Sequence, residues 1–291
     1  MAVGHRGEPA LNIRALKNSL RQGRVAIGTW VFEFNTPGIA RLLATTGVDY
    51  VVYDMEHSGF GIESIRNLVS QSRSIGLAAL VRPPAAHYHL IAPLLDTGAD
   101  GIVAPMIETP GEASQVVDSC RYPPEGRRGA AFSISHDDFL PGDVAGKVRA
   151  ANESVLCSVI IETMRGVENA EGILAVPGID LVWVGYLDLS LSAGTPGQFD
   201  HPRFLEAMNH ILEACDSHRV PAAIVVASPK QAMERVRQGF RCLSYWGDIW
   251  LLQQAISEGV QAIRLGLSRR HTQPAGLRER AAKQRRRKPS R

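Results

Sequence analysis

The chain has 291 residues, of which 45% are hydrophobic and 21% are charged, and this composition is typical of a folded globular protein. It contains no run of about 18 uninterrupted apolar residues and no apolar stretch near its start, so we expect neither a membrane span nor a secretory signal. The net charge of +3 arises from the segment 269–291, because the rest of the chain has more acidic than basic residues. The body of the chain therefore has no nucleic-acid signature.

The four cysteines are widely spaced and form no CxxC pair and no cluster with histidine. This pattern argues against a zinc knuckle and against a disulfide framework, and it favours reduced thiols in a cytoplasm. The cysteines are Cys120, Cys157, Cys215 and Cys242.

Eight short apolar runs follow one another along the chain. They are nearly continuous in apolar residues rather than alternating, which is typical of parallel strands that are buried on both faces. The runs are VAIGTW from Val25, DYVVYDM from Asp49, LAALVRP from Leu77, GIVAPMI from Gly101, VLCSVIIE from Val155, DLVWVGYLDLS from Asp180, PAAIVVAS from Pro221 and CLSYWGD from Cys242.

Amphipathic segments with helix signals separate these runs. In the first, TPGIARLLATTG, Pro37 stands near the start and Gly47 is a C-cap candidate. Eight strands alternating with helices predict a (β/α)8 TIM barrel, with a doubly wound open sheet as the alternative. We predict one barrel domain over 1–268 with an N-terminal helix, followed by a basic, disordered tail over 269–291. We interpret the tail as a solvated terminus, with contact to nucleic acid or an anionic surface as the alternative.

Two further segments stand out. The connection over 121–151 is long for a barrel, and we interpret it as a βα-side excursion with a functional or lid-like role. The segment 249–267 predicts a helix whose apolar face packs either on a neighbouring subunit or on its own barrel. That face consists of Trp250, Leu251, Ile256, Val260 and Ile263.

Catalytic residues of such barrels lie at the carboxyl ends of the strands. Several carboxylates meet this condition here, and carboxylates that are brought together repel one another unless a cation separates them. Glu162 and Asp188 end neighbouring strands, and a hard divalent cation such as Mg²⁺ or Mn²⁺ takes one or two carboxylates plus substrate oxygens. We therefore predict that these two residues hold a metal. The alternative is that Asp188 caps the next helix and Glu162 pairs with Arg165.

His57 and Arg82 are the other chemically active side chains at this rim. Histidine exchanges protons near neutral pH, so His57 is the acid/base candidate, and its alternative is a structural histidine bonded to Asp54 or Glu56. Arg82 offers a fixed fork for a carboxylate or an enolate oxygen. Its alternative, a salt bridge to Glu56 or Asp54, is compatible with that role.

Lysine is absent from the predicted strands. The lysines lie in helical, loop or tail segments, so an imine between a strand lysine and a carbonyl substrate is not expected, and a metal becomes the expected electron sink. No glycine-rich phosphate loop follows the last two strands, which argues against a phosphosugar substrate. The lysines are Lys17, Lys147, Lys230, Lys283 and Lys288.

From about Arg24 to about Leu265 the chain resembles the HpcH/HpaI group of class II pyruvate aldolases, also called hydroxyheptanedioate or 2-keto-3-deoxy acid aldolases. The order and spacing of several motifs together carry the resemblance. These motifs are GTWVFEFNTPGIARLLATTGVDYVVYDMEH, LVRPP, LLDTGADGIVAPMIET, RYPPEGRRG, IIETMRGVENAEGILAVPGIDLVWVGYLDLS and HPRF.

The resemblance implies a phosphoenolpyruvate/pyruvate-type barrel, a divalent metal (Mg²⁺, Mn²⁺ or Co²⁺) on Glu162 and Asp188, and cytoplasmic hexamers made of dimers. It also implies substrates that are a small 2-oxo acid and an aldehyde, as in aromatic compound catabolism. It assigns acid/base work to His57, substrate and enolate contact to Arg82, and a place near the histidine, across a subunit contact, to Asp96. The remaining substrate-binding candidates at this rim are Asp54, Glu56 and Leu187.

Several positions depart from the family pattern. Ile160 stands where a glutamine is frequent, Tyr186 and Leu187 replace smaller residues, and the segment 129–141 lacks the usual arginines. These changes alter the acceptor side of the pocket, so no aldehyde is assigned. The hypothesis is cleavage or formation of a 4-hydroxy-2-oxo acid through a pyruvate enolate. The alternatives are a citrate-lyase-like CoA-thioester lyase and a degenerate barrel that binds a small acid or a protein.

Overall fold

The structure is a computed structural model that describes residues 12–271. Most of the predicted basic tail, from residue 272 onward, lies outside the described residues, as do residues 1–11. By its internal contacts the chain divides into two units, Met1–Asp248 and Ile249–Arg291, and each is described by itself. The predicted domain limit at 268 remains a prediction.

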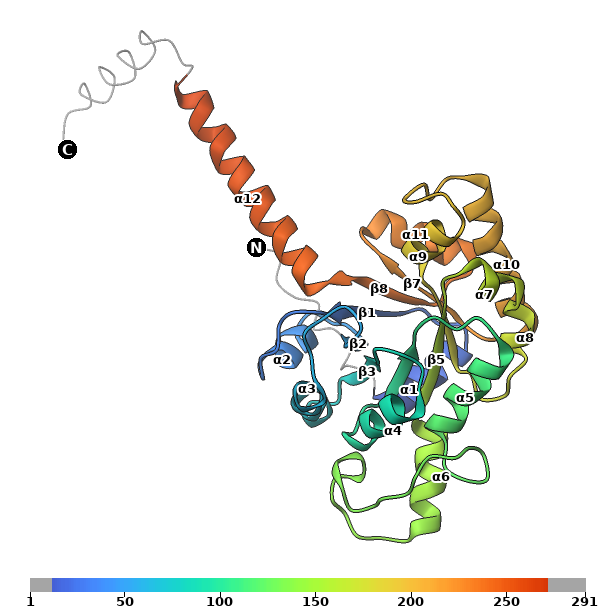
Figure 1. The fold of residues 1–291 in the computed structure, drawn as a ribbon. Coiled ribbons are helices and arrows are strands. Elements are labelled where there is room, and N and C mark those ends of the chain that lie inside the picture. The colour runs from blue at the N-terminus through green and yellow to red at the C-terminus, as the bar shows by residue number, and fades with distance from the viewer. Residues whose placement is uncertain (1–11, 272–291) are drawn as a thin grey trace, which may run out of the picture. The chain divides into compact units, whose positions relative to one another are not determined.

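The first unit is a closed barrel of eight parallel strands in the order β1 to β8 (Figure 1). β1 pairs with β2 on one side and with β8 on the other, which confirms the barrel over the open sheet. Seven strands fall within their predicted apolar runs, and β1 extends one residue, Val31, beyond its run. The strands are β1 Ala26–Val31, β2 Tyr50–Asp54, β3 Ala78–Arg82, β4 Gly101–Ala104, β5 Leu156–Ile161, β6 Leu181–Val184, β7 Ala222–Val226 and β8 Cys242–Gly247.

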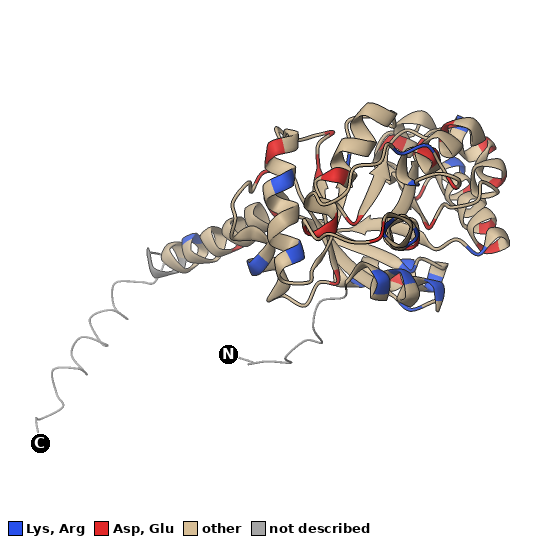
Figure 2. Ribbon diagram, turned by 90° about the horizontal axis from the view of Figure 1, so that it is seen from below, with Lys and Arg blue, Asp and Glu red and all other residues tan. Residues whose placement is uncertain are grey.

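Within the first unit, helices connect the strands and cover the outside of the barrel. Their ends carry the expected signals: Thr109 and Glu112 form a capping box at the start of α5, and Gly239 ends α11 at a φ of 114°. On the side shown in Figure 2, acidic and basic residues are interspersed along these helices. The helices are α1 Ile13–Arg21, α2 Ile39–Ala44, α3 Ile62–Ser74, α4 Tyr88–Asp96, α5 Pro110–Cys120, η1 (3-10) Ser135–Asp137, α6 Val144–Ser154, α7 Met164–Glu168, α8 Ala170–Leu174, α9 Tyr186–Ser192, α10 Pro202–His218, α11 Pro229–Gln238 and α12 Asp248–His271.

Aromatic rings fill the inside of the barrel. Trp183 of β6 meets Trp30 of β1 edge-on at 5.4 Å between ring centroids and Tyr50 of β2 at 6.4 Å. These strands are not neighbours, so their side chains can meet only across the interior. Gly28 leaves room for this packing, because a Cβ there would lie 2.5 Å from the Tyr50 ring. The interior is thus a packed core and not a pore.

The connection over 121–155 corrects one prediction. It follows a helix, α5, and leads into β5, so it is an αβ-side excursion and not the predicted βα-side lid. Among its contacts are bonds to α3 and α4: Arg128 donates to Asp96 at 2.7 Å, and Asp138 accepts from Arg73 at 3.0 Å. The length of the segment indicated something unusual, but length does not tell at which end of a barrel a connection runs.

The second unit contains the rest of α12. From 252 to 268 every described side chain is exposed, including Ile256 at 56% and Ile263 at 65%, so the apolar face predicted for this segment is present and largely uncovered. None of the helices in the described part of the chain is both long and apolar enough to cross a membrane.

Candidate active site

The carboxyl ends of β2, β3, β5 and β6 bring charged side chains together at one end of the barrel. Asp54 and Arg82 are the last residues of β2 and β3, which pair in register, and Glu162 directly follows β5. Asp188 lies in the first turn of α9, which follows β6. Asp188, Glu56 and Arg82 all act electrostatically on Glu162, so the predicted metal pair and the predicted arginine belong to one cluster.

Arg82 is held on three sides. Its Nε donates to Asp54 Oδ1 at 2.6 Å, its Nη1 lies 3.1 Å from Glu56 Oε2, and its guanidinium carbon lies 4.6 Å above the Trp30 ring. The contact with Glu56 is an ion pair without hydrogen-bond geometry. Nη2 has no hydrogen-bond partner among residues 12–271, so this edge of the fork is available for an oxygen of a bound acid.

Asp54 is fully buried, and its oxygens are used by the protein itself. Besides the bond from Arg82, they accept the backbone N–H groups of Glu56 at 3.1 Å and His57 at 2.9 Å. Asp54 therefore shapes the turn after β2 and orients Arg82. Its predicted contact with substrate remains untested, and these bonds support a positioning role.

Glu162 is 4% exposed, and its Oε1 accepts the backbone N–H of Met106 at 2.7 Å. Burial is the main cause that raises the pKa of this carboxyl to about 7, and the negative charges of Asp188 and Glu56 act in the same direction. Burial also raises the pKa of Glu56. A carboxylate in this setting is destabilised unless a positive charge compensates it.

The residues of this cluster fit a divalent cation with few protein ligands. Within residues 12–271, no group of three or more His, Cys, Asp or Glu side chains is arranged to hold a metal ion. Mg²⁺-type sites, however, use only one or two carboxylates and complete their shell with water and substrate oxygens. Glu162 and Asp188 can supply that minimum, and a bound cation would offset both the burial of the Glu162 charge and its repulsion by Asp188.

The other predicted residues lie in different surroundings. The His57 imidazole is 60% exposed, with Nε2 3.9 Å from Glu56 Oε2, so it stands at the edge of the cluster. Leu187 is 54% exposed beside Asp188. Asp96 ends α4 and binds Arg128, and none of its described contacts is with the cluster. One copy of the chain therefore does not bring Asp96 together with His57.

Three residues of this region were not recognised from the sequence. The Trp30 ring makes a cation–π contact with the Arg82 guanidinium. Met106 donates its N–H to Glu162, and Gly185 lies against the Glu162 side chain. Each stands in an apolar or glycine-containing stretch that looks like ordinary strand sequence. Only the left-handed backbone of Met106, at a φ of 56°, is unusual, and sequence does not display it.

Asp248, noted at the end of the eighth strand, has a backbone role. Its carboxylate accepts the N–H groups of Phe32, Glu33 and Phe34 at 2.9 to 3.0 Å and so fixes the turn after β1. Ile160, where the family frequently has glutamine, is buried and stands in register with Trp183. Tyr186 packs edge-on against Phe199 at 5.2 Å.

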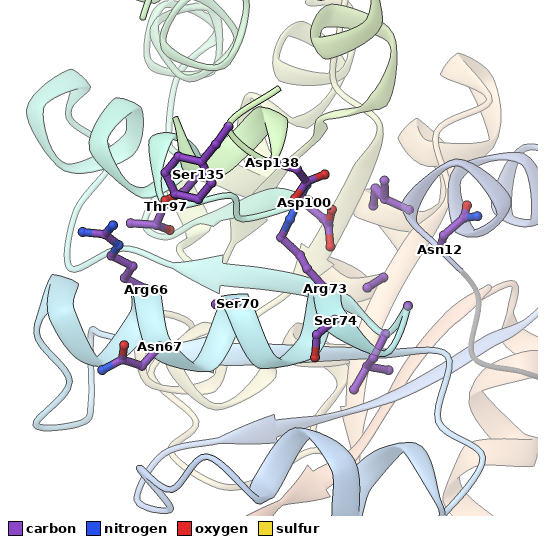
Figure 3. Close-up of a pocket in the computed structure, with 15 residues that line it drawn as sticks. Asn12, Arg66, Asn67, Ser70, Arg73, Ser74, Thr97, Asp100, Ser135 and Asp138 are labelled. Atoms are coloured by element: carbon purple, nitrogen blue, oxygen red, sulfur yellow. Dashed lines mark hydrogen bonds and ion pairs between the residues drawn. The ribbon is translucent and has the colours of Figure 1, made fainter. Parts of the chain in front are cut away.

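A cavity among the described residues lies away from this cluster. It has a volume of about 500 Å³ and is bordered by α3, the start of β3 and the excursion, with Arg73 reaching across to Asp100 and Asp138 (Figure 3). Asp100 precedes β4, so this cavity is at the amino end of the strands. None of the predicted site residues lines it.

A closed parallel barrel with a carboxylate and arginine cluster at the carboxyl ends of its strands defines the class of α/β-barrel proteins that bind ligands at that end. Residues 27–248 match the family model described as HpcH/HpaI aldolase/citrate lyase, and the chain belongs to this family.

Among similar proteins, a 5-keto-4-deoxy-D-glucarate aldolase of Shigella boydii is 31% identical over 82% of this chain and 92% of its own length. A hydroxypyruvate/pyruvate aldolase of Roseobacter denitrificans is 30% identical over 82% of this chain and 93% of that protein. A crystal structure of an HpcH/HpaI aldolase from Desulfitobacterium hafniense has a TM-score of 0.82 at 32% identity, covering 89% of this chain and 98% of that chain.

Proposed function

We propose that this protein is a metal-dependent class II aldolase that cleaves or forms a 4-hydroxy-2-oxo acid through a pyruvate enolate. The observation that carries the proposal is the placement of Glu162 directly after β5 and of Asp188 in the first turn of α9, after the neighbouring β6. Arg82, which is fixed on three sides, acts on the same cluster. The names of the aldolases similar to this chain agree with it.

Glu162 and Asp188 would hold the divalent cation, Mg²⁺, Mn²⁺ or Co²⁺, which when bound polarises the keto group of the substrate as a Lewis acid. Arg82 binds the oxo acid through its free Nη2 edge and stabilises the negative charge that develops on the enolate oxygen. The exposed His57 imidazole moves the proton at the aldol hydroxyl or at the pyruvate methyl. Trp30 and Asp54 keep Arg82 in place, and Glu56 and Leu187 border the acid.

The proposal predicts metal-dependent exchange of the pyruvate methyl protons in deuterated water. The parent protein loaded with Mn²⁺ or Mg²⁺ should exchange these protons, and a chelator should stop the exchange. Glu162→Ala should bind the metal weakly and lose most of the exchange, because half of the protein ligands are gone. Proton NMR of the methyl signal measures the rate. A loaded parent without exchange, together with undiminished metal binding by Glu162→Ala, would falsify the proposal.

Metal affinity should also depend on pH in a defined direction. Because burial raises the Glu162 pKa to about 7, this carboxyl is protonated in acid, and a metal must displace that proton. Affinity should therefore be constant above pH 8 and fall by about tenfold for each pH unit below 7, until other groups titrate. Calorimetric titration with Mn²⁺ between pH 5.5 and 8.5 measures it. A flat profile across pH 7 would contradict the assignment of Glu162 as a ligand.

We further propose a homo-oligomer, following the family resemblance that implies hexamers made of dimers. Two features support it: the uncovered apolar side chains of α12, and the position of Asp96, which can approach a His57 only in another copy. A cytoplasmic location fits the four cysteines, which are all free and buried. A CoA-thioester lyase, the alternative activity, would be revealed by measurable CoA affinity.

A further inference from the structure

Gly185 connects the two residues that we propose as metal ligands. It directly follows β6, and its N–H donates to Ile161 O at 3.2 Å, which places it beside Glu162. Its carbonyl accepts the N–H of Leu189 at 2.9 Å and so opens α9, the helix that carries Asp188. The backbone of Gly185 therefore contacts the residue before Glu162 and also begins the helix that carries Asp188.

The backbone conformation does not explain why this residue is glycine. Gly185 has a φ of −77° and a ψ of 75°, and its negative φ lies outside the left-handed region that favours glycine. The available space does explain it. A Cβ at this position would lie 2.5 Å from the Cβ of Glu162 and still closer to its Oε2. Because one of these atoms is the root of the side chain, a change of rotamer at Glu162 cannot relieve the clash.

The opposite side of the carboxylate is fixed as well. Oε1 accepts the N–H of Met106. The backbone of Met106 is left-handed, a conformation that residues other than glycine and asparagine rarely adopt. Glu162 is also 4% exposed, so it has little free volume into which it could move. β5 and β6 are paired in register just before Glu162, which keeps the two backbones from separating.

We propose that Gly185 and the left-handed Met106 are positioning residues that hold the Glu162 carboxylate at a fixed place relative to Asp188, so that the pair is preorganised for a divalent cation. This inference rests on the proposed function, because it assumes that the pair binds the metal. It predicts that a single methyl group at position 185 weakens metal binding although residue 185 itself offers no ligand.

The test compares Gly185→Ala with a matched glycine. Gly38 is the control, because it has a φ of −82° and no atom within 4 Å of a Cβ built on it. The Mn²⁺ dissociation constant of Gly185→Ala, measured by calorimetry and by the electron paramagnetic resonance signal of free Mn²⁺, should rise by about 10- to 100-fold. Gly38→Ala should bind Mn²⁺ like the parent. Equal affinity of Gly185→Ala and the parent would overturn the inference.

A second variant keeps the inference testable if Gly185→Ala does not fold. The double variant Glu162→Gly, Gly185→Ala removes the side chain with which the methyl collides, so it should recover the thermal unfolding midpoint that the single variant loses. If both variants unfold, the methyl clashes elsewhere and the inference is wrong. Absence of Mn²⁺ binding by the parent would instead overturn the proposed function.

Discussion

Arg82→Lys is expected to lower kcat/KM for pyruvate methyl exchange by about 100- to 1000-fold, the usual effect of losing one charge-stabilising donor. The guanidinium uses Nε for Asp54 and Nη1 for Glu56, and its carbon lies 4.6 Å above the Trp30 ring while Nη2 remains free. The ammonium group of lysine keeps the positive charge. It lacks the rigid planar fork that lets arginine contact Asp54, Glu56 and a substrate oxygen in fixed directions at the same time. The substitution therefore separates the fork geometry of this residue from its charge.

The control for this variant is Arg66→Lys on the exposed side of α3, which should leave the exchange rate unchanged. Thermal unfolding should be followed in parallel, because Asp54 is fully buried and depends on Arg82 for its charge partner. An Arg82→Lys protein that is folded and retains kcat/KM within about threefold of the parent would show that Arg82 does not stabilise the enolate.

Asp180→Ala is expected to lower the free energy of unfolding by about 3 to 5 kcal/mol, as for other buried ion pairs that lose one partner. The Asp180 carboxylate lies 3.0 Å from Lys17 Nζ and 3.0 Å from Arg121 Nη2, and both cations are buried. It also accepts the N–H of Cys157 at 3.0 Å. Lys17 belongs to α1, so this carboxylate ties the N-terminal helix to the amino end of the barrel.

Urea unfolding of Asp180→Ala, followed by circular dichroism, measures the loss. Asp118→Ala is the matched control, because Asp118 pairs at 3.2 Å with Arg127, whose side chain is 75% exposed. Such an exposed pair contributes at most about 1 kcal/mol. If the two variants lose similar stability, the network around Asp180 is not the structural anchor that its burial indicates.

The strands could be predicted because burial on both faces leaves a direct trace in sequence, namely continuous apolar runs. The same signal overran at two strand ends, because the run from Asp180 also continues past Val184, where β6 ends, into α9. The run GIVAPMI continues beyond Ala104, where β4 ends, and includes Met106, which turns into a left-handed conformation and donates to Glu162. Met106 is 50% exposed, so an apolar residue at this position marks neither burial nor the last residue of the strand.

The candidate site could be predicted in part for a similar reason. Glu162 and Asp188 follow neighbouring strands, and parallel strands place their carboxyl ends at the same end of a barrel, so their proximity follows from topology. The roles of Asp54 and Asp248 did not follow, because the donors to each carboxylate are backbone N–H groups that the turn conformation directs toward it. The position of Asp96 away from the cluster within one copy is compatible with the resemblance, which implies that Asp96 meets the histidine across a subunit contact.

The sequence by itself determined the closed barrel, the rim at which the charged residues gather and the family to which the chain belongs, because periodicity, strand order and motif spacing are properties of the chain. Only the tertiary structure decided that the excursion lies on the αβ side, that Arg82 is held by three partners, and that Gly185 leaves room for Glu162. These features depend on atoms that meet across strands and turns, and van der Waals exclusion and hydrogen-bond direction act between such atoms only after the barrel has closed.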